Sequence, residues 1–127
     1  MRLFTPSLKQ STGGNVPSYP KHNAAVNWAT KELGVTEHPP GSNRGKRVEW
    51  YQTFDDLAGG GYPWCVDFCL AAWAAGARRP LPWKTAGAHN FGDYAHRAGW
   101  TTKLENLVPG DLLDWWIGTG HFSMYVG

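Results

Sequence analysis

The sequence has few cysteines, a small net charge and no long hydrophobic run, and each of these features excludes a class of protein. It contains two cysteines among 127 residues, and its formal net charge is +2. Cys65 and Cys69 are separated by about one helical turn, and a disulfide within one helix would be badly strained. We therefore expect two free thiols. The small net charge argues against a nucleic-acid partner.

No apolar run approaches the roughly 18 residues that a membrane-spanning helix needs. We therefore expect no membrane insertion. The first ten residues, MRLFTPSLKQ, lack the apolar core of a signal peptide. These features predict a protein made in the cytoplasm without a signal peptide.

Aromatic residues, in contrast, are abundant. They make up 14% of the chain, with eight tryptophans, and hydrophobic residues make up 42%. Such a composition is typical of one globular domain. The aromatic side chains suit either a groove for an extended polar polymer or the filling of the core.

The order of the sequence patterns predicts an α+β fold, with helices first and an antiparallel sheet second. Residues 1–22 are rich in Ser, Pro, Gly and Thr, which indicates a flexible tail or linker before one domain over residues 23–127. Helical spacing or helix-ending glycines predict four helices, at 23–34 with Asn23 as N-cap, 47–58, 65–76 and 85–99. Alternating or β-branched patterns predict three strands, within 100–105, 110–117 and 121–126.

Cys65 lies at the junction between a glycine run and an almost wholly apolar helix, in GGGYPWCVDFCLAAWAAG. The unpaired N–H groups of a helix N-terminus favour a thiolate, so we expect a lowered pKa for Cys65. The same N–H groups can stabilise an oxyanion, and the glycines leave space before the sulfur. Cys69, one turn deeper, fits a core position.

A cysteine nucleophile needs a base, and the chain has five histidines. His121 begins a predicted strand after GTG, where glycines keep the ring accessible, so it is the preferred candidate. A site with no base at all remains open at this point.

The segments ELGVTEHPPGSNRGKRVEWYQ, GYPWCVDF, VPGDLLDWW and GHFSMYVG together resemble a CHAP domain. CHAP domains are cysteine- and histidine-dependent amidohydrolases or peptidases of the NlpC/P60-like, papain-related superfamily, and they occur in bacteriophage endolysins. The resemblance covers about residues 24 to 127, in the family's order. It implies a papain-like fold in which the helix of Cys65 packs on an antiparallel sheet.

The resemblance also implies a reaction. Cys65 would be the nucleophile and His121 the general base, and the substrate would be an amide of bacterial peptidoglycan. The bond would lie in the stem peptide, in a cross-bridge or at the sugar–peptide junction. No cofactor is implied. A holin or virion proteins would bring the enzyme to the cell wall.

Family members usually carry a third polar residue on a strand beyond the histidine. Here the sequence ends six residues after His121, so we expect the family's C-terminal strands to be missing. Asp114, on the preceding predicted strand, is the candidate to orient His121 in their place.

Four further residues are candidates for substrate binding. Trp64 immediately precedes the nucleophile and is expected to form a wall of the cleft. Tyr62 could donate to the oxyanion or simply pack. Glu37 could anchor its loop, contact substrate or face solvent, and Asn43 could bind substrate or build the turn in GSNRG.

We predict no metal site. Asp55 and Asp56 fit the polar end of a helix better than a calcium site. His89, Asp93 and His96 share one helical face, and a solvated polar stripe explains this spacing without a metal. A zinc site at Cys65 and Cys69 would lack the paired ligand spacing of strong zinc motifs.

Three functions compete at this stage. The first is a thiol-dependent peptidoglycan hydrolase, which the combination of Cys65 and His121 favours. The second is a non-catalytic or incomplete cell-wall binding module with a vestigial Cys–His pair. The third is a papain-like protease that acts on proteins.

Overall fold

The computed structural model describes residues 1–6, 19–118 and 120–127. Within these residues the chain forms a small α+β fold with four α-helices and one three-stranded antiparallel sheet. The strands are β1 (Arg2–Phe4), β2 (Leu112–Trp115) and β3 (His121–Met124). The helices are α1 (Pro20–Lys31), α2 (Lys46–Tyr51), α3 (Cys65–Ala71) and α4 (Ala88–Arg97).

Shorter helical turns complete the described elements. A 3-10 turn, Gln52–Phe54, continues α2, and a π-helical turn, Ala72–Gly76, continues α3. A further 3-10 turn, Leu104–Asn106, lies between α4 and β2.

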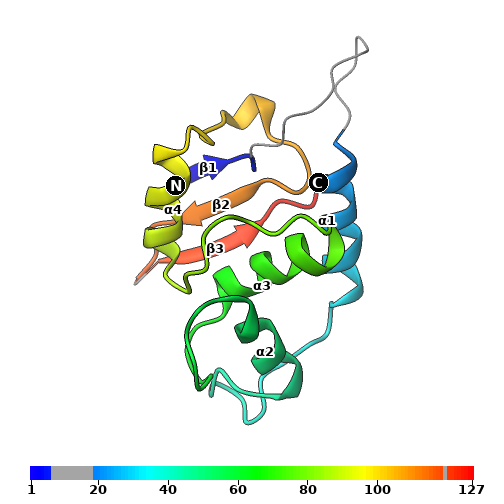
Figure 1. Cartoon of the computed structure of the whole chain (residues 1–127), viewed down its shortest axis with the longest axis vertical. Helices are drawn as coiled ribbons and strands as arrows, with labels where there is room; N and C mark the ends of the chain where they lie inside the picture. Colours follow the sequence, from blue (N-terminus) through cyan, green and yellow to red (C-terminus); the bar gives the residue numbers. More distant parts are fainter. Residues whose placement is uncertain (7–18, 119) are drawn as a thin grey trace.

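The sheet has the strand order β1-β2-β3, so β2 is central and β3 lies at an edge (Figure 1). Its register pairs Phe4 with Leu112, and Asp114 with Phe122. Because side chains alternate along a strand, these four residues share one face. All four are buried, so this is the face that the helices cover.

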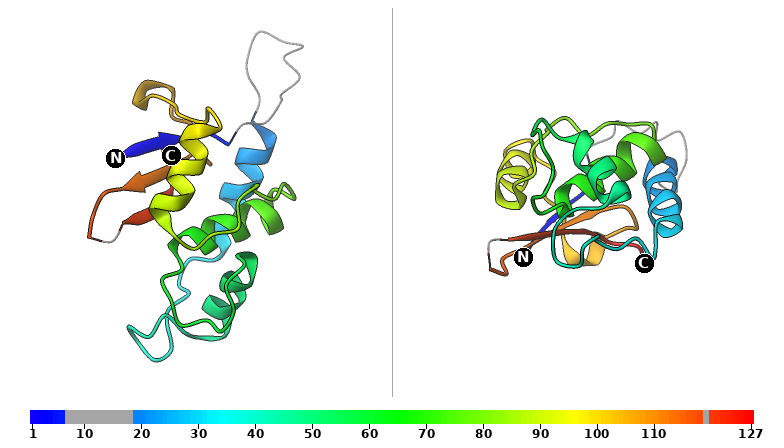
Figure 2. Two further views of the ribbon diagram at one scale, coloured as in Figure 1. Left: turned by 60° about the vertical axis from the view of Figure 1, so that its left-hand side comes forward. Right: turned by 90° about the horizontal axis from the view of Figure 1, so that it is seen from below.

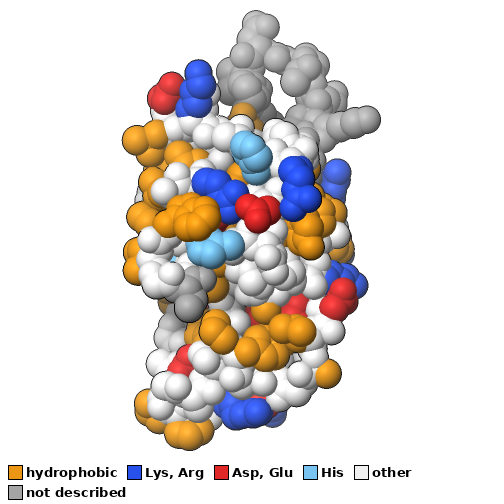
Figure 3. All heavy atoms as spheres, turned by 90° about the vertical axis from the view of Figure 1, so that its left-hand side faces the viewer, with side chains coloured by type: hydrophobic (Ala, Val, Ile, Leu, Met, Phe, Trp, Pro, Cys, Tyr) orange, Lys and Arg blue, Asp and Glu red, His pale blue; other side chains and the backbone are white. Residues whose placement is uncertain are grey.

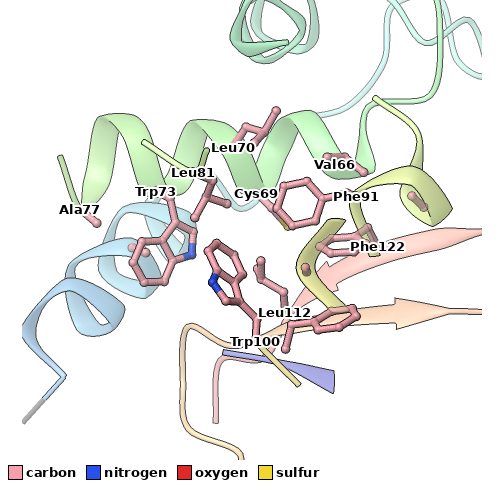
Figure 4. Packing of buried hydrophobic residues seen from close by; sticks show 14 residues of the cluster. Val66, Cys69, Leu70, Trp73, Ala77, Leu81, Phe91, Trp100, Leu112 and Phe122 are labelled. Carbon is pink, nitrogen blue, oxygen red and sulfur yellow. The ribbon is translucent and has the colours of Figure 1, made fainter. Parts of the chain in front are cut away.

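The helices lie on one side of the sheet, as the view from below in Figure 2 shows. The core forms between them and the sheet. Figure 4 shows side chains of α3, α4 and the strands meeting in one cluster. Its fully buried members include Val66, Trp73, Phe91, Leu112 and Phe122. Each large apolar side chain buried in this way contributes about 1.5–3 kcal/mol.

The prediction of a flexible N-terminal tail over residues 1–22 is wrong at both ends of that segment. Arg2–Phe4 forms a strand, because its backbone pairs with β2 more than a hundred residues later in the chain. Helix α1 begins at Pro20, with Tyr19 rather than Asn23 as its N-cap. Proline is favourable in a first turn, where its missing N–H has no partner to lose. The rest of the predicted tail, residues 7–18, lies outside the described residues.

Most of the other predicted elements are confirmed, and one strand is not. Helices occur in the other three predicted windows, and β2 and β3 lie within 110–117 and 121–126. Residues 100–105 do not form a strand. Only Thr101 bridges to Phe4, and the chain then turns into the 3-10 helix at Leu104.

A buried histidine–aspartate pair ties α1 to the turn before β2. His22 Nε2 lies 3.0 Å from Asp111 Oδ1, and the two side chains are 1% and 0% exposed. The other oxygen of Asp111 accepts a hydrogen bond from the Val108 N–H, as expected for a residue that caps the turn. This pair therefore links two segments that are distant in the sequence.

No helix among the described residues combines the length and the apolar character that crossing a bilayer would require.

Candidate active site

Cys65 is the first residue of α3, and its thiol is held among backbone donors. The backbone N–H groups of Phe122, Val66 and Cys65 itself lie near the sulfur, and each acts to lower the pKa of the thiol. Phe122 belongs to β3, so the sulfur lies between the start of a helix and the edge strand of the sheet. Both thiols are free, and Cys69 is buried in the core, as predicted.

The predicted lowering of the Cys65 pKa is wrong. Burial is the largest influence and raises the pKa of this thiol above its ordinary value, and the three N–H groups offset this only in part. Asp67, two residues along α3, adds to the increase. Desolvation disfavours the charged form of any acid, and it outweighs the helix N-terminus here. The thiol is therefore protonated at neutral pH and needs a base.

This raised pKa predicts a pH dependence for the alkylation of Cys65. Only the thiolate reacts with iodoacetamide, so the rate should be low at pH 7 and rise about tenfold per pH unit. The midpoint should lie above the roughly 8.5 of an unperturbed cysteine. Mass-spectrometric labelling of wild type and Cys65→Ala would measure it. A rate already constant between pH 6 and pH 8 would contradict the raised pKa.

His121 is the first residue of β3 and is exposed. His121 and Cys65 line the same groove, which has a volume of about 550 Å³. Among the described residues, no side-chain hydrogen bond joins the two. The structure thus places the predicted nucleophile and base along one groove, on different elements, with no hydrogen bond between their side chains among the described residues.

Asp114 does not orient His121, and that prediction is wrong. Asp114 is fully buried on the helix-covered face and pairs with Phe122, whereas His121 pairs with Trp115. Its Oδ2 lies 2.7 Å from Arg2 Nη2. A buried carboxylate needs such a partner, and β1 supplies it.

Sequence reasoning also missed a neighbour of Asp114. His89 of α4 places its Nδ1 3.7 Å from Asp114 Oδ1, and its ring stacks on Trp116 at 4.0 Å. Figure 3 shows the face on which basic, acidic and histidine side chains lie side by side with hydrophobic ones. A Cβ at Gly120 would contact the ring of His89, so α4 closely supports the turn before His121.

Trp64 and Asn43 line the groove with Cys65, as predicted for Trp64. The indole N–H of Trp64 donates to Glu37 at 3.0 Å, and its ring stacks on Tyr51. Glu37 also accepts backbone hydrogen bonds from Asn43 and Gly41, and these contacts lower its pKa, that from Trp64 most strongly. Glu37 therefore anchors the loop. Asn43 has a φ of 56°, in the left-handed region that suits asparagine, so it builds the turn.

Tyr62 does not offer its hydroxyl to Cys65. The hydroxyl lies 3.1 Å from both oxygens of Asp55 and donates there. Asp55 is itself next to Asp67, which is fully buried and whose oxygens have no hydrogen-bond partner within the described part of the chain. The sequence analysis placed Asp55 at the polar end of a helix and did not predict this carboxyl pair.

The carboxyl pair predicts that Asp67→Asn stabilises the protein at higher pH. Burial, and then Asp55, raise the pKa of Asp67 to about 9. The folded state therefore keeps a proton that the unfolded state releases near pH 4, so stability falls as the pH rises towards 9. Asparagine is neutral and escapes this loss. Between pH 5 and pH 8 wild type should therefore lose about 4 kcal/mol of stability that Asp67→Asn keeps. Urea unfolding at the two pH values measures this difference.

The exposed Asp56 provides the matched control. Asp56→Asn should give the same stability difference from wild type at both pH values. An equal effect of Asp67→Asn at pH 5 and pH 8 would contradict the raised pKa.

The described residues contain no group of three or more acidic, histidine or cysteine side chains placed to hold a metal ion. The three residues on one face of α4 have other partners. Asp93 pairs with Arg2, His96 lies 3.3 Å from the Thr101 hydroxyl, and His89 stacks on Trp116.

Comparison with known proteins adds no relative. No protein-family model, no curated protein and no solved structure matches the chain.

Proposed function

We propose that the protein is a thiol-dependent hydrolase that cleaves an amide of bacterial peptidoglycan, with a papain-like, CHAP-type arrangement of helix and sheet. One observation carries the proposal: Cys65 at the start of a helix and His121 at the start of a strand line the same groove. A cysteine and a histidine so placed are the two groups that acyl transfer needs. The CHAP-like motifs around both residues support peptidoglycan as the substrate.

The raised pKa of Cys65 defines the role of the base. His121 accepts the thiol proton as the sulfur attacks the carbonyl carbon, and the backbone N–H groups around Cys65 stabilise the oxyanion. His121 then donates that proton to the amine as the C–N bond breaks. Water, deprotonated by the same imidazole, hydrolyses the thioester and restores the thiol. No cofactor takes part in these steps.

The site of action would be the cell wall, reached through a holin or as part of a virion. The wall-binding side of the groove would include Trp64 and Asn43.

The test compares wild type with Cys65→Ala on purified peptidoglycan and on casein. We expect wild type to release new amino groups from peptidoglycan and not from casein, and the variant to release none. Circular dichroism should show that the variant is folded, since its side chain loses one atom. Release by Cys65→Ala at the wild-type rate would contradict the proposal.

A second function, cell-wall binding without catalysis, is favoured by two features of the site. The pKa of the Cys65 thiol is raised, and no hydrogen bond joins it to His121 among the described residues. It predicts sedimentation with peptidoglycan that alkylation of Cys65 does not change, together with no released product.

A further inference from the structure

We propose that the free edge of β3 binds the substrate as an additional strand, so that the site accepts an extended peptide with small apolar side chains. This inference rests on the proposed function and narrows its substrate. It places the peptide part of peptidoglycan, rather than its sugar, in the groove beside Cys65.

The backbone of β3 shows which of its residues face that edge. Tyr125, just beyond β3, exchanges backbone hydrogen bonds with Gly110 and Asp111 on the β2 side. Residues of an antiparallel strand alternate in the direction of their backbone groups. Phe122 and Met124 therefore direct their N–H and C=O groups away from β2.

The position of the thiol supports this assignment independently. The Phe122 N–H lies near enough to the Cys65 sulfur to lower the thiol pKa, and α3, which begins at Cys65, packs against β3. Figure 1 shows β3 as the strand next to α3. The N–H and C=O of Met124, farther along the same edge, have no backbone partner within residues 1–6, 19–118 and 120–127.

The groove beside this edge limits what can bind there. Its walls come from β3, α1 and the start of α3, and the lining side chains include Ala29, Leu33, Trp64, Phe68 and Met124. No lysine, arginine, aspartate or glutamate is among the described lining residues, so a positively charged group would find no carboxylate there. Beside the apolar residues the lining offers only a few neutral polar side chains, among them Thr30, Asn43 and Ser123, so apolar peptide side chains match most of these walls better than a hydroxyl-rich sugar does.

An extended peptide fits both the unpaired backbone groups of this edge and the mostly apolar groove beside it. Its backbone can exchange hydrogen bonds with the Met124 N–H and C=O, as in other cases of strand addition. Strand residues advance by about 3.3 Å each, so the peptide residue opposite Met124 lies two positions from the carbonyl opposite Phe122 and Cys65. Bonds to Met124 would thus position that carbonyl at the thiol.

The experiment measures how fast short peptides with an electrophile label Cys65. One series of alanine-rich tetrapeptides ends in a chloromethyl ketone, and the other begins with a chloroacetyl group, so that both chain directions are tested. Each amide is N-methylated in turn, which removes one N–H. Single-residue probes with the same electrophiles show the reactivity of the thiol without strand addition.

In one series we expect the tetrapeptide to label faster than its single-residue probe. Methylation of the one amide that lies two residues from the electrophile should slow the labelling of Cys65 by the tetrapeptide about five- to tenfold. This is the effect of losing one hydrogen bond. Met124→Pro should slow the unmethylated probe similarly relative to Met124→Ala, which keeps the N–H. Proline is tolerated at an outward-facing edge position, so the variant should fold.

The inference is overturned if every methylated probe labels as fast as its parent, or if no tetrapeptide exceeds the single-residue probe. Peptidoglycan cleavage by the same preparation separates the two proposals. Cleavage of peptidoglycan without any effect of methylation would support the proposed hydrolase and contradict strand addition at β3. An effect of methylation without cleavage of peptidoglycan would support strand addition at β3 and contradict peptidoglycan as the substrate.

Discussion

His121→Ala should lower the rate of peptidoglycan cleavage by about 10²- to 10⁴-fold, the usual effect of removing a general base. The thiol is protonated at neutral pH because burial raises its pKa, so the reaction depends on the base. His121 is exposed at the start of β3, and the free energy of unfolding should change by less than about 0.5 kcal/mol. Initial rates of amino-group release would measure the loss.

The control is His96→Ala. His96 is an exposed histidine of α4 whose ring lies near the Thr101 hydroxyl, and its removal should leave the rate unchanged. Full activity of His121→Ala, with loss of activity in His89→Ala, would contradict the assignment and identify His89 as the base.

Asp111→Ala should be the most destabilising of the substitutions considered, at about 2–5 kcal/mol, because it removes the acceptor of two hydrogen bonds at a fully buried position. The variant leaves His22 Nε2 with only the Thr5 hydroxyl as a partner, and the Val108 N–H loses its side-chain acceptor. Thermal and urea unfolding would measure the change in the free energy of unfolding.

Asp93→Ala is the matched control for a carboxylate in an ion pair. Asp93 binds Arg2 at 2.9 Å, but its side chain is 52% exposed. Its removal should cost much less stability than the removal of Asp111, because exposed pairs contribute little. If both variants lowered the free energy of unfolding equally, the buried pair of His22 and Asp111 would not be a stabilising link between α1 and β2.

The sequence predicts those parts of the fold whose signals are local. The alternation around Leu112 and in HFSMYV identified β2 and β3, and the glycine run located the start of α3. Strand β1 was missed because three residues carry no usable periodicity. Arg2–Phe4 is a strand only because β2 lies beside it.

In the candidate site, too, the features with local sequence signals were predicted and those that depend on distant residues were not. Cys65 and His121 were predicted to act together, and they line one groove. The direction of the Cys65 pKa shift was not predictable, because it depends on burial by residues distant in the sequence. The partner of Asp114 was missed for a similar reason, since Arg2 reaches it only through the pairing of β1 with β2.

The most direct test of the central claim is mass spectrometry of the soluble fragments that wild type releases from purified peptidoglycan in H₂¹⁸O. Hydrolysis of an amide through a Cys65 thioester predicts one ¹⁸O in a new carboxyl group and a free amino group on the other fragment, with neither formed by Cys65→Ala. Fragments with ¹⁸O at a sugar reducing end, or no fragments from a folded wild type, would contradict the claim.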